Sequence, residues 1–68
     1  MATGVIKWFD TQRGFGFIRK DDGGPDVLVQ RCAVIAGDAE QLSEGKSVEF
    51  ETARGREGML AISVRLIA

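Results

Sequence analysis

Apolar and polar residues alternate over several short stretches of this chain, and none of its segments has the three- or four-residue spacing of a long amphipathic helix. Residues 4–9 are rich in β-branched and aromatic side chains, which predicts a first strand. Residues 10–14 have the composition of a turn, and residues 13–18 place Phe15 and Phe17 two positions apart. These segments together predict a β-hairpin.

Three further segments, residues 27–30, 46–52 and 60–66, show the period of two that is typical of half-buried strands. Their alternating apolar positions are Val27, Val29, Val48, Phe50, Leu60, Ile62, Val64 and Leu66. We expect the apolar side chains of the first two segments to face the core, and the third to alternate in the same way as a last strand.

Two longer connections separate these strands. Residues 21–26 contain two adjacent aspartates, two glycines and the only proline, which is the composition of a solvated turn. Residues 31–44 form the longest connection, and we expect no more there than a short turn of helix around residues 33–35. Five short strands without a long helix predict an all-β fold, a five-stranded antiparallel barrel of the OB type, in one domain over residues 1–68.

Composition excludes several classes of function. The chain has 68 residues with one cysteine and no histidine, so the usual zinc sites and imidazole-based triads cannot form. No cluster pairs a catalytic acid with a base, or a nucleophile with its activator, so we expect no enzyme, no metal and no cofactor. Cys32 lies in a mostly apolar run, which favours a buried, unreactive thiol.

Charge is distributed unevenly along the chain. The net charge is −1, but the first 20 residues carry four basic groups and one acidic group (+3), whereas the remainder carries five basic and nine acidic groups (−4). The positive end coincides with the aromatic end. No apolar run approaches the ~20 residues that cross a membrane, and the N-terminus lacks the layout of a secretory signal, so we expect a cytoplasmic protein.

The role of Phe15 and Phe17 has two interpretations at this point. In a strand both rings project from one face, while Gly14, Gly16 and Ile18 lie on the other. Paired aromatic residues in strands often belong to the core, which would leave the glycine face exposed. Alternatively the rings form a platform on which nucleobases stack, with Arg13 beside them for phosphate.

The segments Lys7-Trp8-Phe9-Asp10 and residues 13–18 resemble those of bacterial cold-shock proteins, and the resemblance extends over essentially the whole chain. It implies a single OB barrel that binds single-stranded RNA and DNA and keeps RNA unpaired, with consequences for transcription and translation. The stacking and phosphate positions that the resemblance implies in the first two strands are Lys7, Trp8, Arg13, Phe15 and Phe17.

A second motif of that family is changed in this chain. Where the family has phenylalanine, histidine and phenylalanine, this sequence has Leu28, Gln30 and Arg31, and another aromatic position is replaced near Ala39. Arg31 retains a planar guanidinium that stacks on bases or pairs with phosphate, Gln30 can hydrogen-bond a base edge, and Leu28 offers apolar contact. We therefore expect these residues to contribute to a divergent, weaker binder with a shorter footprint.

Two alternatives remain open from the sequence. The basic-Gly-Phe-Gly-Phe pattern also occurs in RRM domains, but that fold needs two helices that this chain does not predict. The barrel also has an alternative role as a protein-interaction or self-association module that pairs through a strand edge. We expect a monomer whose partners are single-stranded RNA and DNA, with a homodimer as the alternative.

Overall fold

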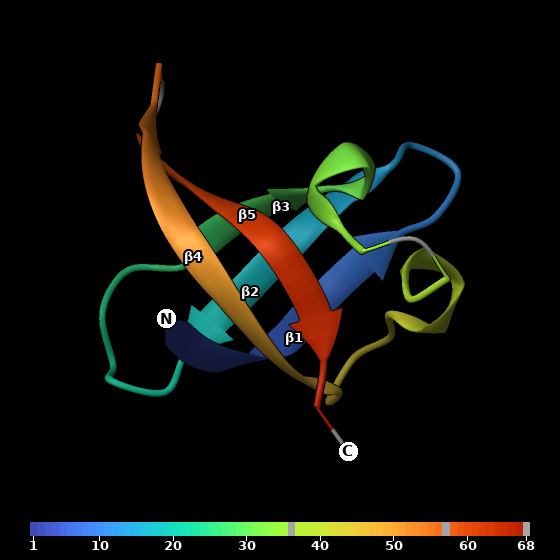
Figure 1. Cartoon of the computed structure of the whole chain (residues 1–68), viewed down its shortest axis with the longest axis horizontal. Coiled ribbons are helices and arrows are strands. Elements are labelled where there is room, and N and C mark those ends of the chain that lie inside the picture. Colours follow the sequence, from blue (N-terminus) through green and yellow to red (C-terminus); the bar gives the residue numbers. More distant parts are fainter. Residues whose placement is uncertain (36, 57, 68) are drawn as a thin grey trace.

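The computed structural model describes residues 1–35, 37–56 and 58–67, with the side chain of residue 39 also left aside (Figure 1). Their regular elements are five strands and two single turns of 3-10 helix. In chain order these are β1 (Ala2–Asp10), β2 (Phe15–Lys20), β3 (Val27–Gln30), η1 (Arg31–Ala33), η2 (Ala39–Gln41), β4 (Ser47–Gly55) and β5 (Gly58–Leu66). The predicted number and order of strands are confirmed.

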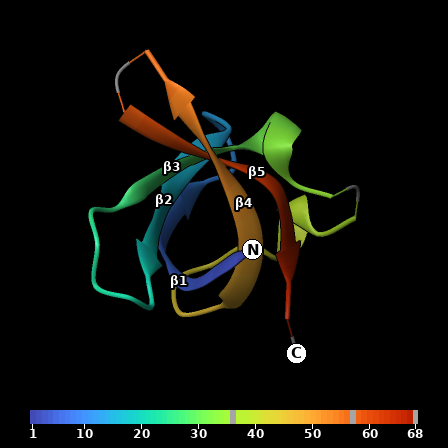
Figure 2. The same cartoon turned by 60° about the vertical axis from the view of Figure 1, so that its left-hand side comes forward.

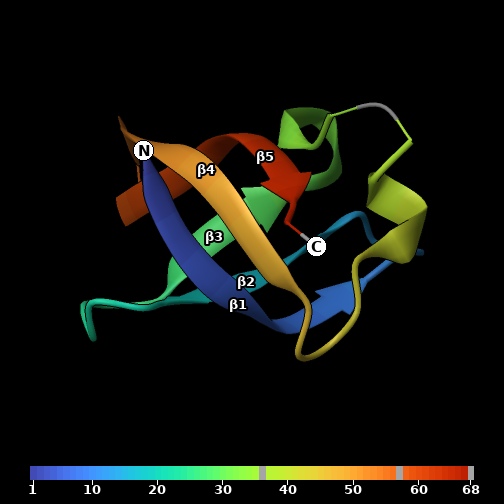
Figure 3. The ribbon, with the colours of Figure 1, turned by 60° about the horizontal axis from the view of Figure 1, so that its bottom comes forward.

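The strands close into a barrel in the order β1-β2-β3-β5-β4. The predicted β1–β2 hairpin is present, and all pairings are antiparallel except the one between β3 and β5, which is parallel and short. The paired ends of β4 and β5 project beyond the body of the barrel (Figure 2). β1 and β4 run side by side near the N-terminus (Figure 3). This arrangement is the predicted OB-type barrel, closed by one parallel pairing.

The core lies inside the barrel and receives side chains from every strand. The most deeply buried large side chains are Phe50, Ile6, Ile18, Val27, Val29, Val48 and Val64. The expected inward positions of β3 and β4 are therefore confirmed. Burial of each such aliphatic side chain contributes about 1.5–3 kcal/mol relative to leaving it in water, which makes this cluster the main source of stability.

Gly16 on β2 lies against the backbone of β1. A Cβ atom added to this glycine would lie 2.2 Å from the Trp8 carbonyl oxygen and 2.7 Å from the Phe9 Cα atom. Only glycine fits at such a distance from another backbone. The glycine face of β2 is thus the inner face, and Phe15 and Phe17 are turned to the outside of the barrel.

The alternation predicted for β5 is only partly correct. Ala61 and Val64 are buried, whereas Ile62 is 39% exposed. Ser63 has a positive φ of 53°, and two β5 residues lie opposite Phe50 between the pairs Glu49–Arg65 and Glu51–Ile62. This β-bulge shifts the inward face by one residue, so that a continuous period of two cannot hold across it.

The connection between β3 and β4 also departs from expectation. Its first helical turn, η1, lies at Arg31–Ala33 rather than around residues 33–35, and it contains no buried residue. The predicted burial of Cys32 is wrong, because this thiol is exposed while Val34 turns inward. Val34 forms a parallel bridge with Val64, which anchors the connection to β5. No helix within the described residues is long and apolar enough to cross a membrane.

Candidate nucleic-acid interface

Three aromatic side chains form a cluster on the outward face of β1 and β2. The ring centroid of Trp8 lies 5.4 Å from that of Phe15 in an edge-to-face arrangement and 5.5 Å from that of Phe17 at a tilt of 58°. Trp8 is 39% exposed, and both phenylalanines are half-buried. We call Trp8, Phe15 and Phe17 the aromatic platform.

Local pairing explains how the chain places these rings together. Trp8 lies opposite Phe17 across the hairpin, and the register shifts between Ile6 and Trp8, so that Lys7 occupies an irregularity of β1. Because successive side chains of a strand point to opposite faces, Phe15 lies on the same outward face of β2 as Phe17. The geometry favours the second of the two interpretations of these phenylalanines, since the core is filled from the opposite face of the strand.

The predicted residues of β3 lie directly beside the platform. Leu28 pairs with Phe17, and Gln30 pairs with Phe15. Val27 and Val29 alternate with them and point into the core. The outward face of β3 therefore continues the surface of the platform, but with a half-buried aliphatic side chain and an exposed amide in place of rings.

The predicted basic residues border this surface, each with a partner. Lys7 Nζ donates a hydrogen bond of 2.8 Å to Asp26 Oδ2 at the start of β3. Arg13 lies in the turn before β2, with its Nε 3.7 Å from Asp10 Oδ2. Arg31 lies across the same turn and donates from Nη1 to the carbonyl oxygen of Thr11 at 3.4 Å. These contacts of exposed side chains are weak, so they do not prevent the basic groups from contacting a phosphate.

A concave region of about 350 Å³ adjoins the platform and includes residues that the sequence analysis did not identify. Its walls bring the β4–β5 hairpin up to the site, with Arg56, Met59 and Leu60 facing Phe17 and Leu28. The parallel pairing of Leu28 with Leu60 produces this proximity. Only the closure of the barrel brings these residues together, so a pattern along the chain does not indicate them.

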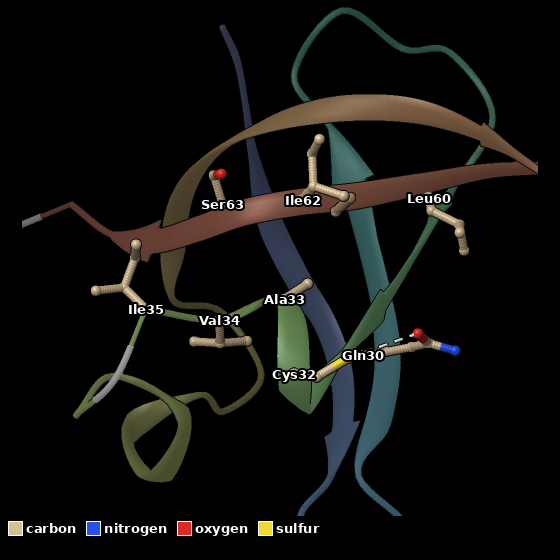
Figure 4. Close-up of a pocket in the computed structure, with 9 residues that line it drawn as sticks. Gln30, Cys32, Ala33, Val34, Ile35, Leu60, Ile62 and Ser63 are labelled. Atoms are coloured by element: carbon tan, nitrogen blue, oxygen red, sulfur yellow. Dashed lines mark hydrogen bonds between the residues drawn. The ribbon is translucent and has the colours of Figure 1, made fainter.

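A second concave region, of about 430 Å³, lies between η1 and β5 (Figure 4). Ala33, Val34 and Ile35 line one side, and Ile62 and Ser63 lie on the other. At its end the exposed Cys32 thiol contacts the Gln30 side-chain oxygen at 3.9 Å. None of the residues that line this region is charged. Its apolar, neutral lining does not suit a polyanion.

The two regions thus differ in chemistry. The platform offers aromatic faces for stacking, hydrogen-bonding groups from Gln30 and Asp26 beside them, and cations at its rim. Stacking on an aromatic side chain is available to every base, because every base has a π-face. Within the described residues, no group of three or more His, Cys, Asp or Glu side chains is arranged to hold a metal ion.

Comparisons with known proteins agree with this chemistry. The family model described as 'Cold-shock' DNA-binding domain matches residues 2–67. The chain is 48% identical to the cold shock-like protein CspA of Stigmatella aurantiaca, with 98% of each chain covered. It is 41% identical to the cold shock protein ScoF of Streptomyces coelicolor, with 94% of this chain and 96% of the relative covered.

A solved structure has the same fold. The structure of drosophila Unr CSD456 matches with a TM-score of 0.79 at 19% sequence identity. The match covers 98% of this chain, which corresponds to 26% of that larger chain. At this level of identity the likeness concerns the architecture of the barrel.

Proposed function

The chain belongs to the cold-shock domain family, and we propose that it binds single-stranded RNA and DNA on the aromatic platform. The observation that supports this proposal most directly is the outward, clustered arrangement of Trp8, Phe15 and Phe17. A tryptophan left 39% exposed loses apolar burial, and stacked bases would restore it. Lys7, Arg13 and Arg31 at the rim supply positive charge for the phosphates.

We further propose that the cellular role of the protein is that of an RNA chaperone. A protein that binds unpaired strands keeps RNA single-stranded, and so acts as an RNA chaperone that influences transcription or translation. The 68 residues act as one domain, in the cytoplasm. The chain is not an enzyme, because it belongs to a family of nucleic-acid-binding domains.

We expect weaker binding than in a cold-shock protein that also carries aromatic rings at the positions of Leu28, Gln30 and Arg31. Leu28 and Gln30 occupy positions beside Phe17 and Phe15 where an aromatic side chain would stack a further base. Each stacked base contributes about 1–3 kcal/mol, so the loss of two corresponds to a decrease of roughly 1.5 to 4 powers of ten in affinity. We therefore propose a short footprint centred on the platform.

A fluorescence titration tests this function. Trp8 is the only tryptophan of the chain, so its emission reports directly on the platform. A pyrimidine-rich single strand at low salt should quench the emission, whereas the same sequence as a duplex should not, since its bases are already stacked. The absence of quenching at high micromolar concentrations of the single strand would contradict the proposal.

Self-association is a second candidate function, favoured by exposed apolar side chains. Ile35, Met59 and Ile62 are 48%, 43% and 39% exposed, and the first and last of these line the uncharged region between η1 and β5. Analytical ultracentrifugation over a wide concentration range tests this role. Dimers that form without any response to a single strand would favour it over nucleic-acid binding.

A further inference from the structure

We propose that the bound strand continues from the aromatic platform along the outward face of β1 and β2 to Arg19, which contacts a phosphate there. This inference rests on the proposed function and adds to it a direction and a residue. This extension of the nucleic-acid strand lies on the side of the platform away from β3, whose outward face lacks rings.

The position of Arg19 follows from the period of β2. Phe15, Phe17 and Arg19 share the outward face, since Gly16 and Ile18 between them are buried. Adjacent residues of one face lie about 7 Å apart along a strand. This spacing is close to that of successive phosphates in an extended single strand, so Arg19 is one nucleotide beyond Phe17.

A shallow groove beside the platform contains Arg19. Lys7, next to Trp8, lines this groove of about 170 Å³ together with Val5 and Arg19 on one side and Glu44 and Gly45 on the other. Val5 is paired with Arg19 across the hairpin. Arg19 therefore lies in a groove that also contains Lys7, the neighbour of Trp8, and is not an isolated basic residue on the surface.

Backbone hydrogen bonds fix the outer wall of the groove. The amide of Gly45 donates to the Ile6 carbonyl oxygen, and the amide of Ile6 donates to the Lys46 carbonyl oxygen, both at 2.9 Å. The segment before β4 is therefore attached to β1. A single-stranded nucleic acid that enters the groove therefore meets a preformed surface, and its binding does not have to order this segment.

Charge also distinguishes Arg19 from its neighbours. Lys7, Arg13 and Lys20 each have a carboxylate partner, namely Asp26, Asp10 and Asp22. The pKa of Asp22 is lowered, chiefly by the hydrogen bond from the Gly24 amide and further by Lys20, so this partner stays charged. Among the described residues no carboxylate forms an ion pair with Arg19, so a phosphate at Arg19 displaces no anion.

A comparison of two variants tests the inference. Arg19→Gln removes one positive charge from the groove. Arg65→Gln removes one that is paired with Glu49 and lies on β5, a strand bonded to neither β1 nor β2. With a pyrimidine strand of about ten nucleotides, R19Q should weaken binding two- to fivefold at low salt. It should also lower the slope of log affinity against log salt by about 0.7, the value for one phosphate of a single strand.

Strand length supplies the second readout. With a strand of about three nucleotides, which covers only the platform, R19Q should bind as the unchanged protein does, and R65Q should match the unchanged protein at both lengths. Equal losses for R19Q and R65Q, or a loss in R19Q that does not depend on length, would overturn the inference. Thermal unfolding of each variant verifies that the barrel is intact.

Glu44→Gln gives an independent result of opposite sign. Glu44 lies on the wall facing Arg19, so its charge repels a phosphate in the groove. Its removal should strengthen binding of the long strand about twofold and leave the short strand unaffected. No gain in E44Q would count against the path. Absence of Trp8 quenching by any strand in the unchanged protein would instead contradict the proposed function.

Discussion

β2 and β3 lie side by side, share the same core, and differ on their outward faces. The inward positions of β2 are Gly16 and Ile18, and those of β3 are Val27 and Val29, all buried. Outside, β2 presents two phenylalanines, whereas β3 presents Leu28 and Gln30. The register pairs each phenylalanine with one of these two residues.

This difference shows that the two faces of one barrel wall respond to separate physical demands. Packing in the core requires residues of the right volume, and both strands satisfy it. The outward face contributes little to closing the barrel, so replacing a ring there by an aliphatic or amide side chain leaves the architecture unchanged. Fold and binding strength are therefore separable by mutation.

Removing both rings of β2 should produce the largest effect. In the variant Phe15→Ala/Phe17→Ala, strand affinity should fall by about 2–6 kcal/mol, because each ring supplies about 1–3 kcal/mol of stacking. Fluorescence anisotropy of a labelled single-stranded nucleic acid measures this affinity. Ile62→Ala, which truncates an exposed apolar residue elsewhere, serves as the control. An unfolded double variant would show that the rings belong to the core, and a folded one with normal affinity would show that bases do not stack on them.

Truncating the inward face of β3 should have the opposite consequence. Val29 is completely buried, so Val29→Ala should lower the free energy of unfolding by about 1–3 kcal/mol through lost burial and a cavity. The affinity for a single-stranded nucleic acid, measured well below the unfolding temperature, should not change. Leu28→Ala, on the outward face, is the matched control and should destabilise less. A larger loss in L28A would mean that the two faces are not separable.

Adding a ring to the outward face of β3 should give the smallest change. Leu28→Phe places an aromatic side chain opposite Phe17, and affinity for a single strand should increase by about 1 kcal/mol, close to fivefold. The free energy of unfolding should stay within about 0.5 kcal/mol, as expected for a surface substitution. Unaltered affinity would show that the strand does not cross β3 at this position.

Much of the fold could be predicted because the barrel is built from local alternation. The hairpin, the inward valines of β3 and the inward Val48 and Phe50 of β4 all follow from a period of two. The outward orientation of Phe15 and Phe17 did not follow from the pattern alone, because either face of β2 was compatible with a core. The close contact of Gly16 with the Trp8 backbone resolves it.

The features that escaped prediction depend on contacts between distant segments. The bulge at Ser63 is defined by pairing with β4, and the exposure of Cys32 follows from a single helical turn that has no periodic face. Likewise, the ion pair of Lys7 with Asp26 joins residues 19 positions apart. Such features carry little signal in sequence, because register and loop geometry are fixed only when the barrel closes.

The short parallel pairing between β3 and β5 has a consequence for synthesis on the ribosome. β5 supplies Ala61 and Val64 to the core and joins the two open edges of the sheet, yet it is the last strand to be translated. Until it emerges, the nascent chain holds an incomplete sheet with an uncovered apolar face. The barrel therefore cannot close before β5 has been synthesised, and a chain that still lacks β5 is the form most exposed to aggregation and proteolysis.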